Sequence, residues 1–203
     1  MKIVLASRNK KKIAELQRLL EEASDLDLQV LSLDDIGFFD EIEENGVTFE
    51  ENSYIKAAVP ASLGYIGVAD DSGLMVDCLG GEPGVYSARY SGANATDATN
   101  NDKLLAKLDG VSADLRGAKF VCVVTCVFPD GRTFHVRREC PGRILNEAAG
   151  NGGFGYDPLF YYEPFGKTFA ELSGEEKNQI SHRGLAMKEF IRELTEILSG
   201  KKG

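Results

Sequence analysis

Residues 67–74 read Gly-Val-Ala-Asp-Asp-Ser-Gly-Leu, so that a short apolar run leads directly into two adjacent carboxylates. The run begins at Tyr65, and its composition predicts a buried strand over residues 65–69 that ends at Asp70 and Asp71. Neighbouring carboxylates repel each other strongly where the dielectric constant is low. In an α/β sheet the carboxyl end of a strand faces the crevice where ligands bind, which makes the pair a candidate ligand site. An ordinary turn at Asp71-Ser72-Gly73 explains this short stretch equally well.

The sequence on both sides of the pair predicts alternating strands and helices. We expect further strands over residues 2–6, 28–33, 119–128 and 134–140. Helical spacing of apolar residues predicts helices over residues 13–23, 49–63, 97–108 and 184–198, with a possible kink or break at Pro60. The pattern contains no internal repeat and no linker-like segment, which favours one α/β unit over residues 1–203.

Composition limits the possible partners and the compartment. The formal net charge of −9 disfavours binding to a polyanion such as DNA, so basic residues must act locally. No signal sequence and no apolar stretch of membrane length is present, so we expect a cytoplasmic protein that binds no membrane. The four cysteines form no CxxC pair, and we interpret them as reduced core residues.

Two charged segments could together bind a metal-complexed phosphate. Residues 7–12 read Ser-Arg-Asn-Lys-Lys-Lys between a predicted strand and a predicted helix, where free backbone N–H groups and the helix dipole attract phosphate. A capped helix with a solvated basic face is the simpler interpretation of these residues. A Mg²⁺ ion between the Asp pair and a polyphosphate would relieve the repulsion of the two carboxylates.

An acidic loop over residues 40–46 precedes the second predicted helix. Most such loops are merely solvated, but one of its carboxylates could complete a metal site with Asp71. Lys56, on the helix that follows, could balance the negative charge. The local spacing does not choose between Glu43 and Glu44.

Two later segments have the composition of a base-binding site. Residues 150–158 combine four glycines with Phe154, Tyr156 and Asp157, and an aromatic face can stack on a base. Glycine turns with aromatic residues in the core would look similar. His182 and Arg183 form a pair of donors before the last helix, suited to an oxygen acceptor such as a purine O6, although a helix cap with exposed neighbours is the simpler account.

Taken together, these segments resemble the inosine triphosphate pyrophosphatase family, also called the Ham1 or dITP/XTP pyrophosphatase family. The matching stretches are SRNKKK, ENGVTFEENSYIKA, VADDSGLMVDCLGGEPGVYSARYSG, GNGGFGYDPLF and ELSGEEKNQISHRGLAM, in the order of the family and from Ser7 to Met187. One departure is Arg8, which stands where many relatives have glycine.

The resemblance implies a role for each matching residue. Asp71 would be the catalytic acidic residue, and Glu44 with Asp71 would hold Mg²⁺. The phosphates would be bound by Ser7, Asn9, Lys12 and Lys56, and Ser72 would be a further substrate contact. The base and sugar would be bound by Phe154, Gly155, Tyr156, Asp157, Lys177, His182 and Arg183.

The same resemblance implies the fold and the reaction. We expect an elongated mixed α/β sheet with flanking helices, two lobes around a nucleotide-binding cleft, and a homodimer. The implied reaction is hydrolysis of ITP, dITP or XTP to the nucleoside monophosphate and pyrophosphate. Exclusion of GTP must then depend on the 2-position of the base. A pyrophosphatase for modified pyrimidine or canonical nucleotides, and a nucleotide-binding sensor without activity, are the two alternatives.

Overall fold

Seven strands form one mixed sheet in the order β2-β1-β3-β4-β5-β6-β7 in a computed structural model that describes residues 1–23 and 26–200. The strands are β1 (Lys2–Leu5), β2 (Gln29–Leu31), β3 (Ile66–Val76), β4 (Gly117–Val127), β5 (Thr133–Ile144), β6 (Phe160–Tyr162) and β7 (Lys167–Thr168). β1 pairs in parallel with β2 and β3, whereas β6 pairs antiparallel with β5 and β7. The predicted mixed sheet is therefore confirmed.

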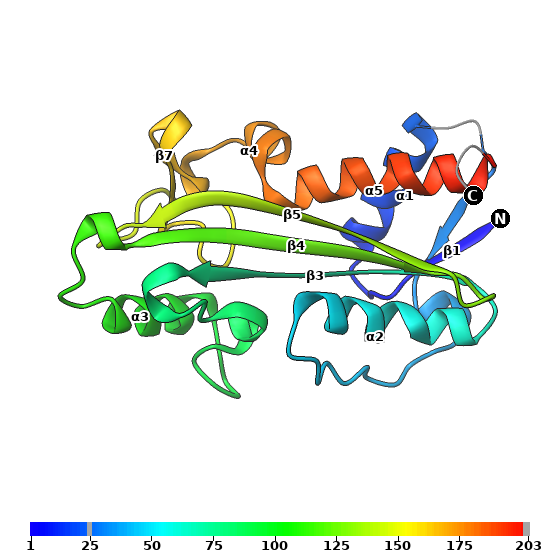
Figure 1. The fold of residues 1–203 in the computed structure, drawn as a ribbon, viewed down its shortest axis with the longest axis horizontal. Coiled ribbons are helices and arrows are strands. Elements are labelled where there is room, and N and C mark those ends of the chain that lie inside the picture. Colours follow the sequence, from blue (N-terminus) through cyan, green and yellow to red (C-terminus); the bar gives the residue numbers. More distant parts are fainter. Residues whose placement is uncertain (24–25, 201–203) are drawn as a thin grey trace. The chain divides into compact units, whose positions relative to one another are not determined.

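Five α-helices accompany the strands within the described ranges (Figure 1). They are α1 (Lys10–Ala23), α2 (Phe49–Ser62), α3 (Asp97–Lys107), α4 (Gly174–Ile180) and α5 (His182–Leu198). Short 3₁₀ helices cover Asp34–Ile36, Asp77–Leu79, Gly84–Arg89, Ala113–Leu115, Glu163–Phe165 and Phe169–Glu171. None of the helices in this part of the chain is long and apolar enough to cross a membrane.

The chain divides into two compact units, which interleave along the sequence. Unit 1 consists of Met1–Asp71, Val123–Arg137 and Ala186–Gly203. Unit 2 consists of Ser72–Cys122 and Arg138–Leu185. β3, β4 and β5 each contribute residues to both units. The division matches the expectation of two lobes, and the units are described separately below.

In unit 1, α2 covers one face of the strands, and α1 and α5 cover the other (Figure 1). Alanines of α2 at positions 57 and 61 pack with Ala69 of β3, which brings helix and strand close together. A Cβ atom at Gly67 would collide with the carbonyl oxygen of Ala57, so glycine permits this close approach. On the other face, Phe190 of α5 stacks on Phe134 of β5 at 5.3 Å between ring centroids.

In unit 2, α3 packs on one face of the strands and an aromatic cluster forms part of the core. Leu104 and Leu108 are fully buried against residues of β3 and β4. Phe120 of β4 contacts the rings of Phe160 and Phe169, with centroids at 4.5 and 5.6 Å. Phe120 and Phe169 also line the cavity described below.

Most predicted elements are present, and one prediction about β3 is wrong. The strand does not end at the Asp pair but continues through it to Val76. The apolar alternation resumes at Leu74 and Val76, both of which are fully buried, so the strand has a buried face beyond the carboxylates. The alternative of a turn at residues 71–73 fails for the same reason.

Two smaller predictions also need correction. α2 continues through Pro60 without a break and ends two residues later, so the loss of the one backbone N–H that proline lacks is not enough to end the helix there. Three of the four cysteines are buried, as expected, but Cys78 is exposed on the short helix that follows β3. None of the four, all of which lie within the described residues, forms a disulfide.

Candidate functional site

The two carboxylates of β3 face different helices of unit 1. Asp70 accepts two hydrogen bonds from Lys12 of α1, at 3.0 and 2.7 Å. Asp71 accepts one from Lys56 of α2, at 3.2 Å. Successive side chains of a strand point to opposite faces, and Figure 1 shows α1 and α2 on opposite faces. The alternation of side chains along β3 therefore places the two carboxylates on opposite faces of the sheet.

This arrangement corrects the interpretation of the pair as carboxylates that share one cation. Each carboxylate has a lysine of its own, and the side chain of Asp70 is only 7% exposed. A buried carboxylate is stabilised when a charge partner also donates hydrogen bonds to it. Only Asp71 is therefore left as the member of the pair that could hold a metal ion together with the acidic loop.

Lys56 joins Asp71 to the acidic loop. Its Nζ donates to Glu44 Oε2 at 2.7 Å as well as to Asp71 Oδ1 at 3.2 Å. Glu44 is half-buried, whereas Glu43 is exposed. Burial alone would lower the pKa of Lys56, but the carboxylates of Asp71 and Glu44 outweigh it and the pKa is raised. Lys56 therefore stays charged and holds two carboxylates together.

Asp71 has the chemistry expected of a reactive carboxylate. Burial raises its pKa, Lys56 opposes the rise, and the charge of Glu44 supports it. Asp71 Oδ2 is buried and has no hydrogen-bond partner of good geometry among the described residues, although the nearby Asn52 side chain lowers the pKa of Asp71 by hydrogen bonding.

The described residues contain no cluster of three or more carboxylate, histidine or cysteine ligands suited to a metal. The carboxylates of Glu44 and Asp71, which both bind Lys56, are thus the candidate ligands for a metal ion. Mg²⁺ commonly takes one or two protein carboxylates and fills its other positions with water and substrate phosphates. Glu44 and Asp71 are oxygen donors of the kind that this requirement needs, and both are held by Lys56.

Residues 7–12 form a capped helix start, as the sequence predicted. Asn9 Oδ1 accepts from the backbone N–H groups of Lys11 and Lys12, at 3.0 and 3.4 Å, and Ser7 Oγ accepts from Asn9 N–H at 3.1 Å. Arg8 has no left-handed backbone. Its guanidinium instead binds Asp34 and the carbonyl oxygens of Phe38 and Asp40, which ties the loop after β2 to this turn.

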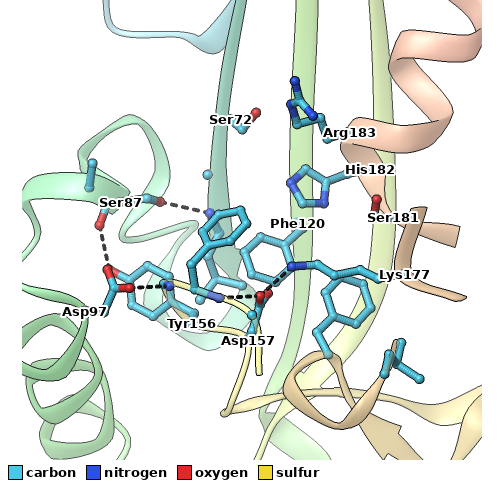
Figure 2. A pocket seen from close by; sticks show the side chains of 18 of the residues that line it. Ser72, Ser87, Asp97, Phe120, Tyr156, Asp157, Lys177, Ser181, His182 and Arg183 are labelled. Carbon is cyan, nitrogen blue, oxygen red and sulfur yellow. Dashed lines mark hydrogen bonds and ion pairs between the residues drawn. The ribbon is translucent and has the colours of Figure 1, made fainter. Parts of the chain in front are cut away.

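Unit 2 contains a cavity of about 470 Å³. Figure 2 shows side chains from β3, β4, the glycine-rich loop and the start of α5 around it. All of the predicted site residues of this unit line the cavity, namely Ser72, Phe154, Gly155, Tyr156, Asp157, Lys177, His182 and Arg183. The volume is typical of small-molecule sites. Unit 1 contains the other predicted site residues, Ser7, Asn9, Lys12, Glu44, Lys56 and Asp71.

A buried ion pair organises one wall of the cavity (Figure 2). Lys177 forms a short contact with Asp157, and its ammonium group lies 4.4 Å from the centroid of the Phe154 ring. The same Asp157 carboxylate accepts from the Phe154 N–H at 2.8 Å. A Cβ atom at Gly153, whose φ is +74°, would collide with this carboxylate. The glycine-rich loop is therefore built around Asp157.

The start of α5 carries the expected pair, His182 and Arg183, which lie on the same side of the cavity as Lys177 in Figure 2. Ser181 caps α5, since its Oγ accepts from the Gly184 N–H at 3.2 Å, and His182 and Arg183 occupy the first turn of that helix. The cap and the donor pair are therefore both present. The His182 ring stacks on Phe120 at 4.8 Å between centroids and 11° between planes.

The sequence analysis did not single out several residues that line the cavity. Phe120 lies in the apolar run of β4, so it looked like an ordinary core residue, and only the fold places it under His182. Asp97 was expected merely near the start of a helix. Both line the cavity, together with Ser87, Asn100, Phe169 and Asn178. Tyr156 donates to the carbonyl oxygen of Ser87 at 2.8 Å, which fixes that wall.

Comparison with known proteins identifies close relatives. A dITP/XTP pyrophosphatase of Syntrophobacter fumaroxidans is 49% identical over 197 residues, covering 97% of this chain and 83% of the relative. One of Bacillus cereus is 44% identical over 202 residues, covering 98% and 97%. The structure of a HAM1 protein from Coxiella burnetii matches with a TM-score of 0.90 at 41% identity, covering 97% of this chain and 99% of that one. The family model of the Ham1 family matches residues 3–193, and the chain belongs to this family.

Proposed function

We propose that this chain hydrolyses the non-canonical purine nucleotides ITP, dITP and XTP to the nucleoside monophosphate and pyrophosphate. The observation that carries the proposal is the cavity of unit 2, in which aromatic rings and the donors Lys177, His182 and Arg183 surround a space suited to a base. The two curated relatives described above are dITP/XTP pyrophosphatases, and their alignments cover 97% and 98% of this chain, which supports the same reaction.

The donors of the cavity support selectivity for a 6-oxo purine. A 6-oxo group can accept from His182 or Arg183, whereas a 6-amino group would meet these donors with another donor. Leaving such buried groups unmatched costs a few kcal/mol, which corresponds to at least tenfold discrimination. Phe154 and Tyr156 would hold the base and sugar, together with Gly155, Asp157 and Ser72. The Ser72 Oγ supports this role, because it is buried with no hydrogen-bond partner among the described residues.

The charged residues of unit 1 support a phosphate role. Ser7, Asn9 and Lys12 would bind the triphosphate at the start of α1, where the dipole favours negative charge. Glu44 and Asp71 would hold Mg²⁺, which would neutralise the phosphate oxygens and favour departure of pyrophosphate. Lys56 would stabilise the charge that moves toward the β- and γ-phosphates.

Asp71 is proposed as the catalytic acidic residue. Its Oδ2 would accept a hydrogen bond from the water that attacks the α-phosphorus, while Lys56 keeps its Oδ1 in place. The bond between the α-phosphorus and the bridging oxygen breaks, and pyrophosphate leaves with that oxygen. Burial raises the pKa of Asp71, which makes the carboxylate a better proton acceptor than an ordinary aspartate.

We further propose that residues 1–203 act as one functional domain and that the protein is a homodimer. The interleaved sequence of the two units supports the first proposal, because neither unit is a continuous segment. Asp71 and Ser72 are consecutive residues of β3, so one peptide bond joins the two sets of site residues. Size-exclusion chromatography with light scattering would test the second proposal, and a monomeric mass would refute it.

The test of the function is pyrophosphate release from ITP, XTP, GTP, ATP and dTTP in parallel, with Mg²⁺. We expect rapid release of pyrophosphate from ITP and XTP and little from the other three. Asp71→Asn should abolish the release while leaving the fold intact by circular dichroism. Release of orthophosphate, or equal turnover of all five nucleotides, would refute the proposed reaction or its selectivity. Binding of ITP without turnover would identify the sensor alternative.

A further inference from the structure

The first turns of α3 hold the backbone of the glycine-rich loop. Asp97 Oδ2 accepts a hydrogen bond from the Gly155 N–H at 2.7 Å, and Asn101 Nδ2 donates one to the Gly155 carbonyl oxygen at 3.0 Å. Asp97 and Asn101 are four residues apart and therefore lie on the same face of the helix. Figure 2 shows the Asp97 carboxylate directed at this loop.

These two bonds fix the peptide groups on both sides of Gly155. The N–H belongs to the peptide that joins Phe154 to Gly155, and the carbonyl belongs to the peptide that joins Gly155 to Tyr156. Gly155 has a φ of +61°, a left-handed conformation that glycine adopts without strain. A flexible residue in the loop is thus held in one conformation by a neighbouring helix.

Phe154 is the side chain most dependent on this restraint. It lines the cavity, yet it is 72% exposed, so core packing contributes little to its position. Its ring contacts the ammonium group of Lys177, and its N–H is bound by Asp157. Apart from the contact with Lys177, the position from which the ring projects into the cavity therefore depends on the backbone at residues 154 and 155.

Helix capping does not account for the Asp97 carboxylate. The N-cap of α3 is Thr96, whose side chain accepts from the Thr99 N–H at 3.2 Å, and Thr99 completes a capping box in return. The neighbouring Asn100 binds a different segment, through the carbonyl oxygens of Ser87 and Ala88. The bonds to Gly155 thus belong to Asp97 and Asn101 alone among these residues.

We propose that Asp97 and Asn101 are positioning residues that hold the Phe154 ring in place to stack on the purine base. The proposal rests on the proposed function for the identity of the ligand, but the geometry of the loop is independent of it. By fixing the ring before the nucleotide arrives, the two residues would reduce the entropy lost on binding. Their effect should therefore be on affinity and not on the chemical step.

A tryptophan in place of Phe154 tests the positioning without any nucleotide. The chain contains no tryptophan, so Phe154→Trp creates a single fluorescent reporter at this site. We expect its steady-state anisotropy to fall, and its quenching by acrylamide to rise, when Asp97→Ala or Asn101→Ala is added. Asp102→Ala, at an exposed position of the same helix, is the matched control and should change neither quantity.

A double-mutant cycle tests the consequence for the substrate. Asp97→Ala should raise the KM for ITP by about five- to tenfold, as expected for loss of one charge-assisted hydrogen bond at an exposed site, with kcat within about twofold. Asp97→Asn keeps an acceptor oxygen and should restore most of the affinity. In a Phe154→Ala background, Asp97→Ala should change the KM by less than about twofold.

The outcomes separate the two proposals. If the unaltered protein releases no pyrophosphate from any nucleotide, the proposed function fails, while the anisotropy still decides whether α3 positions residue 154. Unchanged anisotropy in both alanine variants would overturn the positioning role. The positioning role would also be overturned if Asp97→Ala raised the KM equally in the Phe154→Ala background, or raised it for ITP but not for dITP. Either result would favour direct contact between Asp97 and the sugar.

Discussion

Replacement of Lys56 by methionine should reveal how strongly the candidate metal site depends on its lysine. The substitution keeps the length of the side chain but removes the cation that binds Glu44 and Asp71. The Lys56 and Asp71 side chains are each 13% exposed, and Glu44 is 33% exposed. Removing one partner of a buried ion pair costs about 3–5 kcal/mol, and exposure of Glu44 reduces this to about 2–4 kcal/mol here. For a chain of this size, the melting temperature should fall by about 4–16 °C.

Differential scanning fluorimetry at neutral pH measures this loss. Arg18→Met is the matched control in unit 1, since Arg18 and Glu22 form a pair with both side chains more than half exposed. Such exposed pairs contribute at most about 1 kcal/mol, so the control should shift the melting temperature only slightly. Equal shifts in the two variants would refute the view that Lys56 holds together a partly buried pair of carboxylates.

The dependence of stability on pH and on Mg²⁺ gives a second readout of the same variant. Burial already raises the pKa of Asp71, and without Lys56 the rise should be larger. Between the unfolded and the folded pKa, the folded state then binds more protons than the unfolded state, so stability falls as pH rises through this window. Lowering the pH toward 5 should therefore recover stability in Lys56→Met more than in the parent.

Mg²⁺ should also stabilise Lys56→Met more than the parent, because the ion no longer competes with an ammonium group for the two carboxylates. Absence of any Mg²⁺ effect in the variant would contradict the assignment of Glu44 and Asp71 as metal ligands.

Two further predictions follow from the described side chains. A thiol reagent should label the native protein once, at Cys78, because the other three cysteines are buried. Burial also raises the pKa of Cys126 to about 12 and that of Cys140 to about 11, which disfavours the reactive thiolate. Mass spectrometry counts the labels, and a second label would contradict the burial of the other cysteines. Phe120→Leu should raise the KM for ITP about three- to tenfold, because it removes the ring on which His182 stacks. Steady-state kinetics measure this change, and an unchanged KM would contradict a role in binding for the stacking of His182 on Phe120.

The sequence predicted most of the longer helices and strands, because these depend on local patterns. Apolar spacing placed α2 and α3 within one residue of their observed ends. The motif around Asp71 was recognised as a candidate site, with Lys56 and the acidic loop as its partners, but the choice between Glu43 and Glu44 depends on a tertiary contact, the hydrogen bond from Lys56 to Glu44. Phe120 and Asp97 were missed for the same reason, since a core strand residue and a helix start acquire a role only through tertiary contacts.

The error at β3 shows why the Asp pair could not be interpreted from its own sequence. Repulsion between adjacent charges suggested the end of a strand or a shared cation. A strand offers a third solution, because its period of two residues directs Asp70 and Asp71 to opposite faces. That solution requires a cation on each face, and the sequence places Lys12 and Lys56 far from the pair and from each other.

The division of the site residues has a consequence for how the protein can be dissected. The charged set lies in unit 1 and the cavity in unit 2, so the simplest dissection would express and assay each unit alone. However, unit 2 consists of two separate segments, and β3, β4 and β5 each continue into unit 1. Excising either unit would cut three strands and expose unpaired edges, which favour aggregation. The two sets of residues are therefore best separated by point substitutions in the full chain, with Lys56 and Asp97 as the first positions.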